Sequence, residues 1–416
     1  MEKLNNTDLV ALLLAIGTML ILSRIVAELG KRWKMPVVMG ELLVGIALGP
    51  TILGTFHPDL FNTLFPLKTN PHFSIALDGI VSLSVILLLF VAGMEVQLPV
   101  VLRQGKAAIT TGLGSMIIPF ATGFAIAWWK PEWFGLTAAQ GEGYIFPIFL
   151  GTALSISALP VIARILMDLN LFKTNIGMII IASAMFNDLV GWLVFSFILS
   201  YAGKNGAEHM SVWTTVVAIL AFGAFMLFVG RKVIDKVLPW VQTKLSWPGG
   251  VLALCMSICM FSAAFTESIH IHAILGAFIA GIAIGDSVHL REQAREIIHQ
   301  FVTNFFAPLF FVSIGLKVNF IEHFDWLTVT IILVLAFVGK VAGAGIGARL
   351  AGIDRRSSMA IGFGLNARGA MEIILGTLAF DAGLISQTVF VALVMMALIT
   401  SLSSGPLMRR YTTELA

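Results

Sequence analysis

The sequence predicts an all-α polytopic membrane protein. Of its 416 residues, 58% are hydrophobic and only 12% are charged, and the mean hydropathy is +0.94. A soluble chain of this length has too little interior to hide so much apolar surface, whereas a lipid bilayer accepts it. Few segments alternate polar and apolar residues, which argues against a transmembrane β-barrel. The 39 glycines suit closely packed and broken helices.

Thirteen apolar segments are long enough to be membrane spans. They cover residues 8–29, 36–54, 79–97, 107–129, 144–166, 174–201, 212–231, 249–267, 272–288, 303–321, 327–350, 358–382 and 387–408. The polar N-terminus lacks the basic start and cleavage site of a signal peptide, so the first span is expected to stay. We expect no soluble domain after Ala416, and hence no cytosolic nucleotide-binding regulator.

Lysine and arginine set the orientation. With thirteen alternating spans, eighteen of the 26 basic residues fall in one set of loops and five in the other. The basic set marks the cytosolic side. The N-terminus is therefore expected outside and the C-terminus in the cytosol of a prokaryotic inner or plasma membrane. The net charge of +3 reflects these flanks, so lipid is the expected surroundings and no nucleic-acid partner is expected.

Asp188 is the most informative residue. It follows Asn187 near the middle of the sixth span, with about a dozen residues on either side. A carboxylate at mid-bilayer costs about 2.5–3.5 kcal/mol on insertion scales and marks an ion or proton pathway by default.

Two spans carry residues that interrupt helices. The fifth contains Thr152, Ser155, Ser157 and Pro160, and the twelfth contains the run from Gly362 to Gly369 with an Asn and an Arg. The two spans are seven apart, and an odd offset reverses direction in the membrane. Paired interruptions in inverted halves are typical of the binding site of a secondary transporter. The alternative is that each motif only kinks a packed helix.

Three further charged residues lie deep in predicted spans. Lys340 is mid-way along the eleventh span and is the natural partner for Asp188, because each offsets the desolvation of the other. Arg368 and Glu372 are four apart, so a helix would place them on one face, where they support the break. A purely structural ion pair remains the alternative for Lys340.

The chain resembles the monovalent cation:proton antiporters, especially the Kef, GerN and plant CHX-like branch. The resemblance rests on motifs that occur in order along the whole chain: residues 36–50, 89–95, 153–166, 186–188, 275–281, 308–316 and 364–369. Kef systems also carry a cytosolic nucleotide-binding domain, which is not expected in this chain. A gated K⁺ efflux system is therefore kept only as an alternative function, and a cation channel is the other.

The resemblance implies two inverted repeats, a homodimer and an elevator-type motion. The implied parts are scaffold helices at 1–104 and 248–325, transport-core helices at 105–202 and 326–416, and a linker helix at 203–247. By motif position, Asp188 is the shared cation and proton site, Asn187 its neighbour and Lys340 its charge partner. Thr152 supplies ligands from the fifth span, and Ser155 is assigned to the same site.

The expected function is exchange of Na⁺ or K⁺ for H⁺, with Asp188 and Thr152 as ligands of the transported cation and no cofactor. An enzyme is disfavoured, because the sequence holds no zinc-protease, nucleophile-elbow or phosphate-loop motif. A channel is disfavoured because no filter loop is recognisable. A transport-dead sensor is the third rival.

Overall fold

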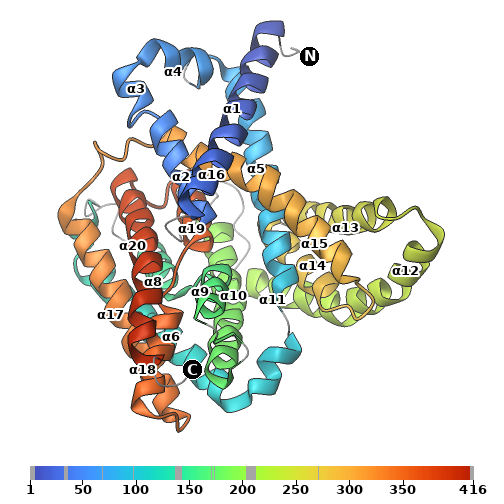
Figure 1. Ribbon diagram of the computed structural model, residues 1–416, viewed down its shortest axis with the longest axis vertical. Coiled ribbons are helices and arrows are strands. Elements are labelled where there is room, and N and C mark those ends of the chain that lie inside the picture. Colours follow the sequence, from blue (N-terminus) through green and yellow to red (C-terminus); the bar gives the residue numbers. More distant parts are fainter. Residues whose placement is uncertain are drawn as a thin grey trace. The chain divides into compact units, whose positions relative to one another are not determined.

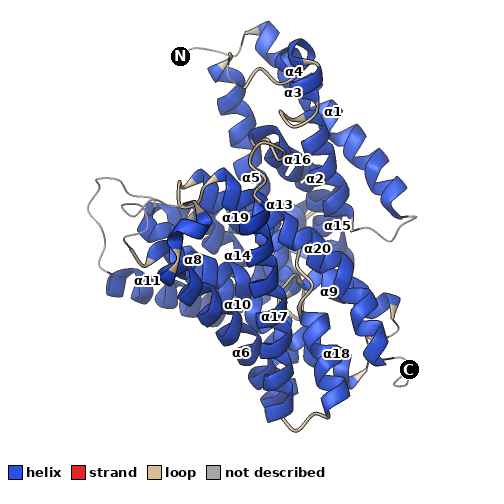
Figure 2. Ribbon diagram, turned by 90° about the vertical axis from the view of Figure 1, so that its left-hand side faces the viewer, coloured by secondary structure: helices blue, strands red, loops and turns tan. Residues whose placement is uncertain are grey.

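A computed structural model describes residues 5–412, except 32–35, 68, 97, 136–142, 170, 173, 203–211 and 270. Within this described part the chain is helical, and its helices are joined by turns and short loops without a β-strand (Figure 2). The prediction of an all-α protein is confirmed. The chain separates into two compact units, residues 1–95 with 220–323, and residues 96–219 with 324–416.

Unit 1 combines the first helices of the chain with a group from its middle. Its helices are α1 (Asn6–Lys31), α2 (Val37–Leu48), α3 (Leu53–Phe56), α4 (Pro58–Leu64), α5 (Pro71–Glu95), the π-helix η2 (Met226–Gly230), α12 (Arg231–Lys244), α13 (Gly249–Ser268), α14 (Ala273–Gly285), α15 (Glu292–Phe301), the π-helix η3 (Val302–Phe306) and α16 (Ala307–Lys317). In Figure 1, α13, α14 and α15 gather on one side of α5.

Glycines let the helices of unit 1 touch through their backbones. A Cβ added at Gly315 of α16 would lie only 2.0 Å from the carbonyl carbon of Gly45 on α2. One added at Gly93 of α5 would lie 2.1 Å from the Phe278 oxygen on α14. Such contacts are typical of membrane helices, where close packing takes over from the hydrophobic effect.

Unit 2 contains the remaining helices. They are α6 (Leu98–Trp129), the 3₁₀ helix η1 (Pro131–Phe134), α8 (Ile145–Ser155), α9 (Leu159–Asp168), α10 (Asn175–Ala202), α17 (Trp326–Leu350), α18 (Arg355–Leu365), α19 (Ala370–Asp381) and α20 (Gln387–Thr412), while α11 (Val212–Phe225) runs across the division. Helices α17, α18 and α20 lie side by side (Figure 1). An apolar core joins α9, α10, α17, α18 and α20.

Eleven helices of the described part are long and apolar enough to cross a membrane. The ninth and twelfth predicted segments are not among the eleven: α14 lies in the ninth, and α18 and α19 share the twelfth. The fifth is among them, although it is divided into α8 and α9. The chain is therefore a multi-span membrane protein, and the total of thirteen spans stays a prediction.

The predicted span boundaries that differ most from the structure lie in the seventh and tenth spans. The seventh was expected to end at 231, but the helical run continues through η2 into α12 as far as Lys244. The tenth was expected to begin at 303, but α15 and η3 extend it back to Glu292. Hydropathy misses both extensions because α12 and α15 are amphipathic and bury only one face, which includes Leu238 and Ile298.

Candidate ion-binding site

Two interrupted helices meet inside unit 2. Helix α8 ends at Ser155 and α9 begins at Leu159, while α18 ends at Leu365 and α19 begins at Ala370. The Ala158 N–H donates to the Ala367 carbonyl over 3.0 Å, and the Ser157 hydroxyl donates to the Leu365 carbonyl over 2.9 Å. The two breaks are thus hydrogen-bonded to each other.

Local sequence explains where these helices begin. Pro160 lies in the first turn of α9, where a missing N–H costs nothing. Asp354 caps α18, since its carboxylate accepts from the N–H groups of Arg356 and Ser357 at 2.9 and 3.0 Å. Glu372 caps α19 by accepting from the Gly369 N–H at 2.9 Å. Each start is therefore encoded in the residues around it.

Two buried, positively charged side chains donate to the last carbonyls of α8, which have no partner within the helix. The Lys340 ammonium donates to the Ser155 carbonyl. The Arg368 guanidinium donates to the Ala153 carbonyl at 2.9 Å and also to the Leu154 carbonyl. The last carbonyls of a helix have no partner within it and carry partial negative charge, so positive side chains stabilise them.

Four charged side chains gather around these breaks, all of them buried. They are Asp188, Lys340, Arg368 and Glu372. Arg368 and Glu372 form the predicted pair, with 3.9 Å between guanidinium nitrogen and carboxylate oxygen. Lys340 lies within electrostatic reach of Arg368, Glu372 and Asp188. The direct pairing of Lys340 with Asp188 stays a prediction.

Asn187 is fixed against α6. Its side-chain amide lies 2.7 Å from the Ser115 hydroxyl. When the amide oxygen faces that hydroxyl, the amide nitrogen also donates to the carbonyls of Gly112 and Ser183, at 3.0 and 3.2 Å. These bonds hold the segment of α10 that carries Asp188, so Asn187 fits a positioning role.

The two hydroxyls predicted on the fifth span are buried in α8. Thr152 donates to the Ile148 carbonyl at 2.7 Å. Ser155 lies within hydrogen-bonding distance of the carbonyls of Gly151 and Met116, at 2.7 and 2.9 Å. Both hydroxyl hydrogens are therefore engaged, while the oxygens keep lone pairs for a cation or water.

Sequence reasoning missed two serines that hold the site together. Ser115 on α6 bonds Asn187, and Ser401 on α20 donates to the Arg368 carbonyl at the second break. The available signal was a buried hydroxyl within an apolar span, but many such residues bond only their own helix. Thr377, for example, donates to the Ile373 carbonyl one turn back.

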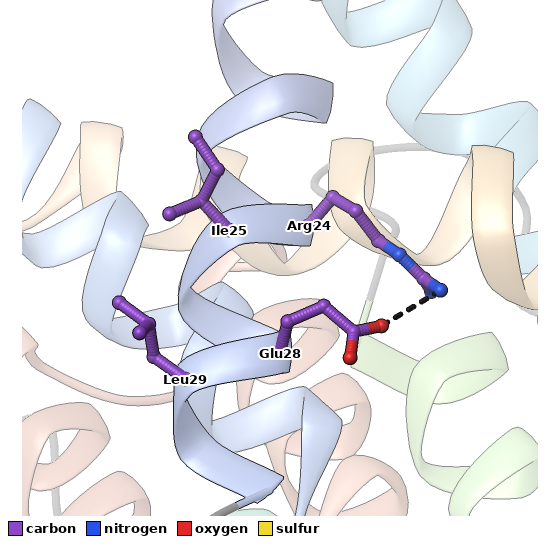
Figure 3. A pocket seen from close by; sticks show the side chains of 4 residues that line it. All are labelled: Arg24, Ile25, Glu28 and Leu29. Atoms are coloured by element: carbon purple, nitrogen blue, oxygen red, sulfur yellow. Dashed lines mark ion pairs between the residues drawn. The ribbon is translucent and has the colours of Figure 1, made fainter.

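A surface pocket on α1 contains none of these residues (Figure 3). It has a volume of about 530 Å³ and is lined by Arg24, Ile25, Glu28 and Leu29. Arg24 and Glu28 form an ion pair of 2.8 Å there. Among the residues that the structure describes, no group of three or more His, Cys, Asp or Glu side chains is placed to hold a metal ion.

A family comparison accounts for this architecture. The family described as "Sodium/hydrogen exchanger, transmembrane" matches residues 15–411. The chain belongs to this family. It is thus a transporter and not an enzyme, and the resemblance seen in its motifs is confirmed.

Several curated relatives are cation/proton antiporters. The chain is 30% identical over 408 residues to the Na⁺/H⁺ antiporter NhaS4 of Synechocystis sp., covering 97% of both proteins. It is 28% identical to the Na⁺/H⁺-K⁺ antiporter GerN of Bacillus cereus, covering 95% of this chain and 94% of GerN. It is 30% identical to the cation/H⁺ antiporter 17 of Arabidopsis thaliana over 95% of this chain, but spans only 48% of that protein.

A solved structure shares the fold. The sodium/proton antiporter MjNhaP1 from Methanocaldococcus jannaschii aligns over 98% of both chains with a TM-score of 0.62 and 16% sequence identity. At this identity the likeness shows the arrangement of the helices.

Proposed function

We propose that the protein exchanges Na⁺ or K⁺ for H⁺, with Asp188 as the group that binds either one. The observation that carries the proposal is the buried Asp188 carboxylate, which lies within electrostatic reach of the Lys340 ammonium in the unit that holds the two joined breaks. A buried carboxylate needs a compensating charge, which a proton or a cation supplies equally well.

Competition between the cation and the proton for the Asp188 carboxylate is sufficient for antiport. A proton that binds Asp188 removes the charge that attracts the cation, and a bound cation opposes protonation. Each therefore displaces the other whenever the site faces one side of the membrane. The names of the near full-length relatives, a Na⁺/H⁺ and a Na⁺/H⁺-K⁺ antiporter, support Na⁺ and K⁺ as cargo.

We assign the moving part to unit 2. Its helices carry Asp188 and both breaks, and the predicted core ranges 105–202 and 326–416 fall within it. The predicted scaffold ranges 1–104 and 248–325 fall mainly in unit 1. The predicted linker starts at 203, outside the described residues. We further propose a homodimer in a prokaryotic plasma membrane, with its C-terminus in the cytosol.

The test is exchange in proteoliposomes. A pH gradient is imposed across vesicles that contain the purified chain, and Na⁺, K⁺ or Li⁺ is added outside while a dye reports internal pH. The wild type is expected to dissipate the gradient on addition of Na⁺ or K⁺. Asp188→Asn keeps the side-chain volume but cannot ionise, so its signal is expected to fall to that of empty vesicles.

Two outcomes would reject the proposal. Retained exchange in Asp188→Asn would remove this carboxylate from its role. Cation flux that needs no counter-moving proton and does not saturate would favour a channel. Equal yield and thermal stability of the two proteins are required, so that loss of transport is not loss of folding.

A further inference from the structure

The carboxyl ends of α8 and α18, which lie at the two breaks, receive different hydrogen-bond donors. Lys340 and Arg368 both donate to the carbonyl end of α8. At the end of α18, the recorded donors are neutral: the Ser157 hydroxyl on Leu365, and backbone N–H groups on Gly362 and Gly364. A helix end with partial negative charge and neutral donors attracts a cation, whereas two fixed positive charges repel one.

Asn366 stands at this end of α18. It is the C-cap residue of the helix, and its side chain is fully buried, with 0% exposure. Neither its amide oxygen nor its amide nitrogen has a hydrogen-bond partner among the described residues. Leaving a buried polar group unpaired is costly, and such groups in native proteins call for a functional or solvent partner.

The residues that flank Asn366, Leu365 and Ala367, belong to the same apolar core as Ala184 and Met185, which lie about one turn before Asp188 on α10. Arg368, two residues beyond Asn366, and Asp188 both act electrostatically on the Lys340 ammonium. Helix α18 also packs on α10, since a Cβ at Gly364 would lie 3.0 Å from the Ile180 side chain. Asp188 follows Ile180 by about two helical turns on α10.

We propose that the transported cation is held at the carboxyl end of α18, with the Asn366 side-chain oxygen as a ligand. A partly hydrated cation explains both unpaired atoms, because the oxygen binds the ion and a water accepts from the amide nitrogen. The cation then lies at a helix end that carries partial negative charge and receives neutral donors. This inference rests on the proposed exchange function and adds a ligand to it.

The test measures cation affinity in proteoliposomes with Asn366→Leu, which removes both polar atoms at similar volume. The KM for Na⁺ or K⁺ is expected to rise about ten-fold or more, as for loss of one interaction with a charged partner. The maximal rate is expected to stay within about two-fold. Thermal stabilisation of the purified protein by the same cation is expected to fall in parallel, and this second readout does not depend on transport.

Two further variants keep the inference falsifiable. Thr377→Val removes a buried hydroxyl that bonds only its own helix, so its KM is expected to match the wild type. Asn366→Asp keeps an oxygen in place, so its KM is expected at or below the wild-type value, and this holds as a test even if Asn366→Leu does not fold. An unchanged KM in Asn366→Leu, or a raised KM in Asn366→Asp, would overturn the inference. Failure of the wild type to exchange at all would instead reject the proposed function.

Discussion

Arg368 shows how one buried side chain holds the crossing together. It donates to two carbonyls of α8 and lies 3.9 Å from Glu372, which in turn caps α19. Both members of the pair are fully buried. Removing one member of a buried ion pair leaves the other charge buried without its partner. The resulting loss of stability is larger than the net stabilisation that the intact pair provides.

Arg368→Met is therefore expected to destabilise the protein by about 3–5 kcal/mol, because it leaves Glu372 charged and buried without its partner. Adding Glu372→Gln is expected to recover part of that loss, since the remaining group is neutral. Thermal unfolding in detergent, followed by the fraction of monodisperse protein, measures both steps. Equal stability of the single and double variants would contradict a coupled pair.

The residues that define the breaks were readable from sequence, but their partners were not. Gly, Pro and Ser in apolar spans predicted interruptions in the fifth and twelfth spans, and the chain is interrupted there at 156–158 and 366–369. The donors from Lys340 and Arg368 end on backbone carbonyls of α8. Every residue has a carbonyl, so no sequence pattern marks which one a distant cation will meet.

At the scale of elements, glycine sets how closely α6 and α17 approach. A Cβ at Gly343 would lie 2.3 Å from the Gly114 oxygen, and one at Gly347 would lie 2.3 Å from the Thr110 oxygen. Gly345, on the same helix, has only the Ser358 oxygen at 3.7 Å. The glycines that close packing requires therefore lie on the face of α17 that contacts α6.

Gly343→Ala is expected to lower stability by about 1–3 kcal/mol, the usual cost of overpacking a tight contact. Gly345→Ala, two residues along, serves as the matched control and is expected to be neutral or slightly stabilising, since alanine favours a helix. Thermal unfolding of both variants makes the comparison. Equal losses would show that helix propensity, and not the contact with α6, decides the outcome.

Helix α17 also carries a pH-dependent cap. The Asp325 carboxylate accepts from the Thr328 N–H at 2.8 Å and from its hydroxyl at 2.6 Å. These bonds favour the ionised form and hold the pKa of Asp325 below its usual value. The pKa of Asp325 is lower in the folded protein than in the unfolded chain, where it is near 4. The cap therefore contributes its full stabilisation above about pH 4, and this stabilisation is lost as the pH falls through the pKa of the folded protein.

Asp325→Ala is accordingly expected to cost about 1 kcal/mol at neutral pH, and the difference from the wild type should shrink below about pH 4. Asp325→Ser keeps a capping oxygen without the charge, so it should retain most of the stability without the acid step. Unfolding curves across pH provide the measurement. A difference between wild type and Asp325→Ala that does not change with pH would argue against an ionised cap.

For the whole molecule, the net charge carried across the membrane per exchanged cation depends on how many groups release a proton when the cation binds. Asp188 is the one carboxylate in the Asn187–Asp188 motif, and Lys340 donates its ammonium to the Ser155 carbonyl at the end of α8. If an ammonium held in this way keeps its proton while the cation enters, one cation replaces one proton. We therefore expect the exchange to be electroneutral.

The corresponding prediction concerns the response to membrane potential. Uptake of labelled Na⁺, driven by a fixed pH gradient, is expected to proceed at the same rate when the potential is clamped at zero and at a negative value inside. Asp188→Asn vesicles measure the leak under each clamp. If Lys340 also gave up its proton, two protons would leave for each cation that enters, net positive charge would move outward, and a potential negative inside would slow uptake. A slower rate at negative potential would therefore assign Lys340 to proton transport, whereas equal rates leave it as the cap of α8.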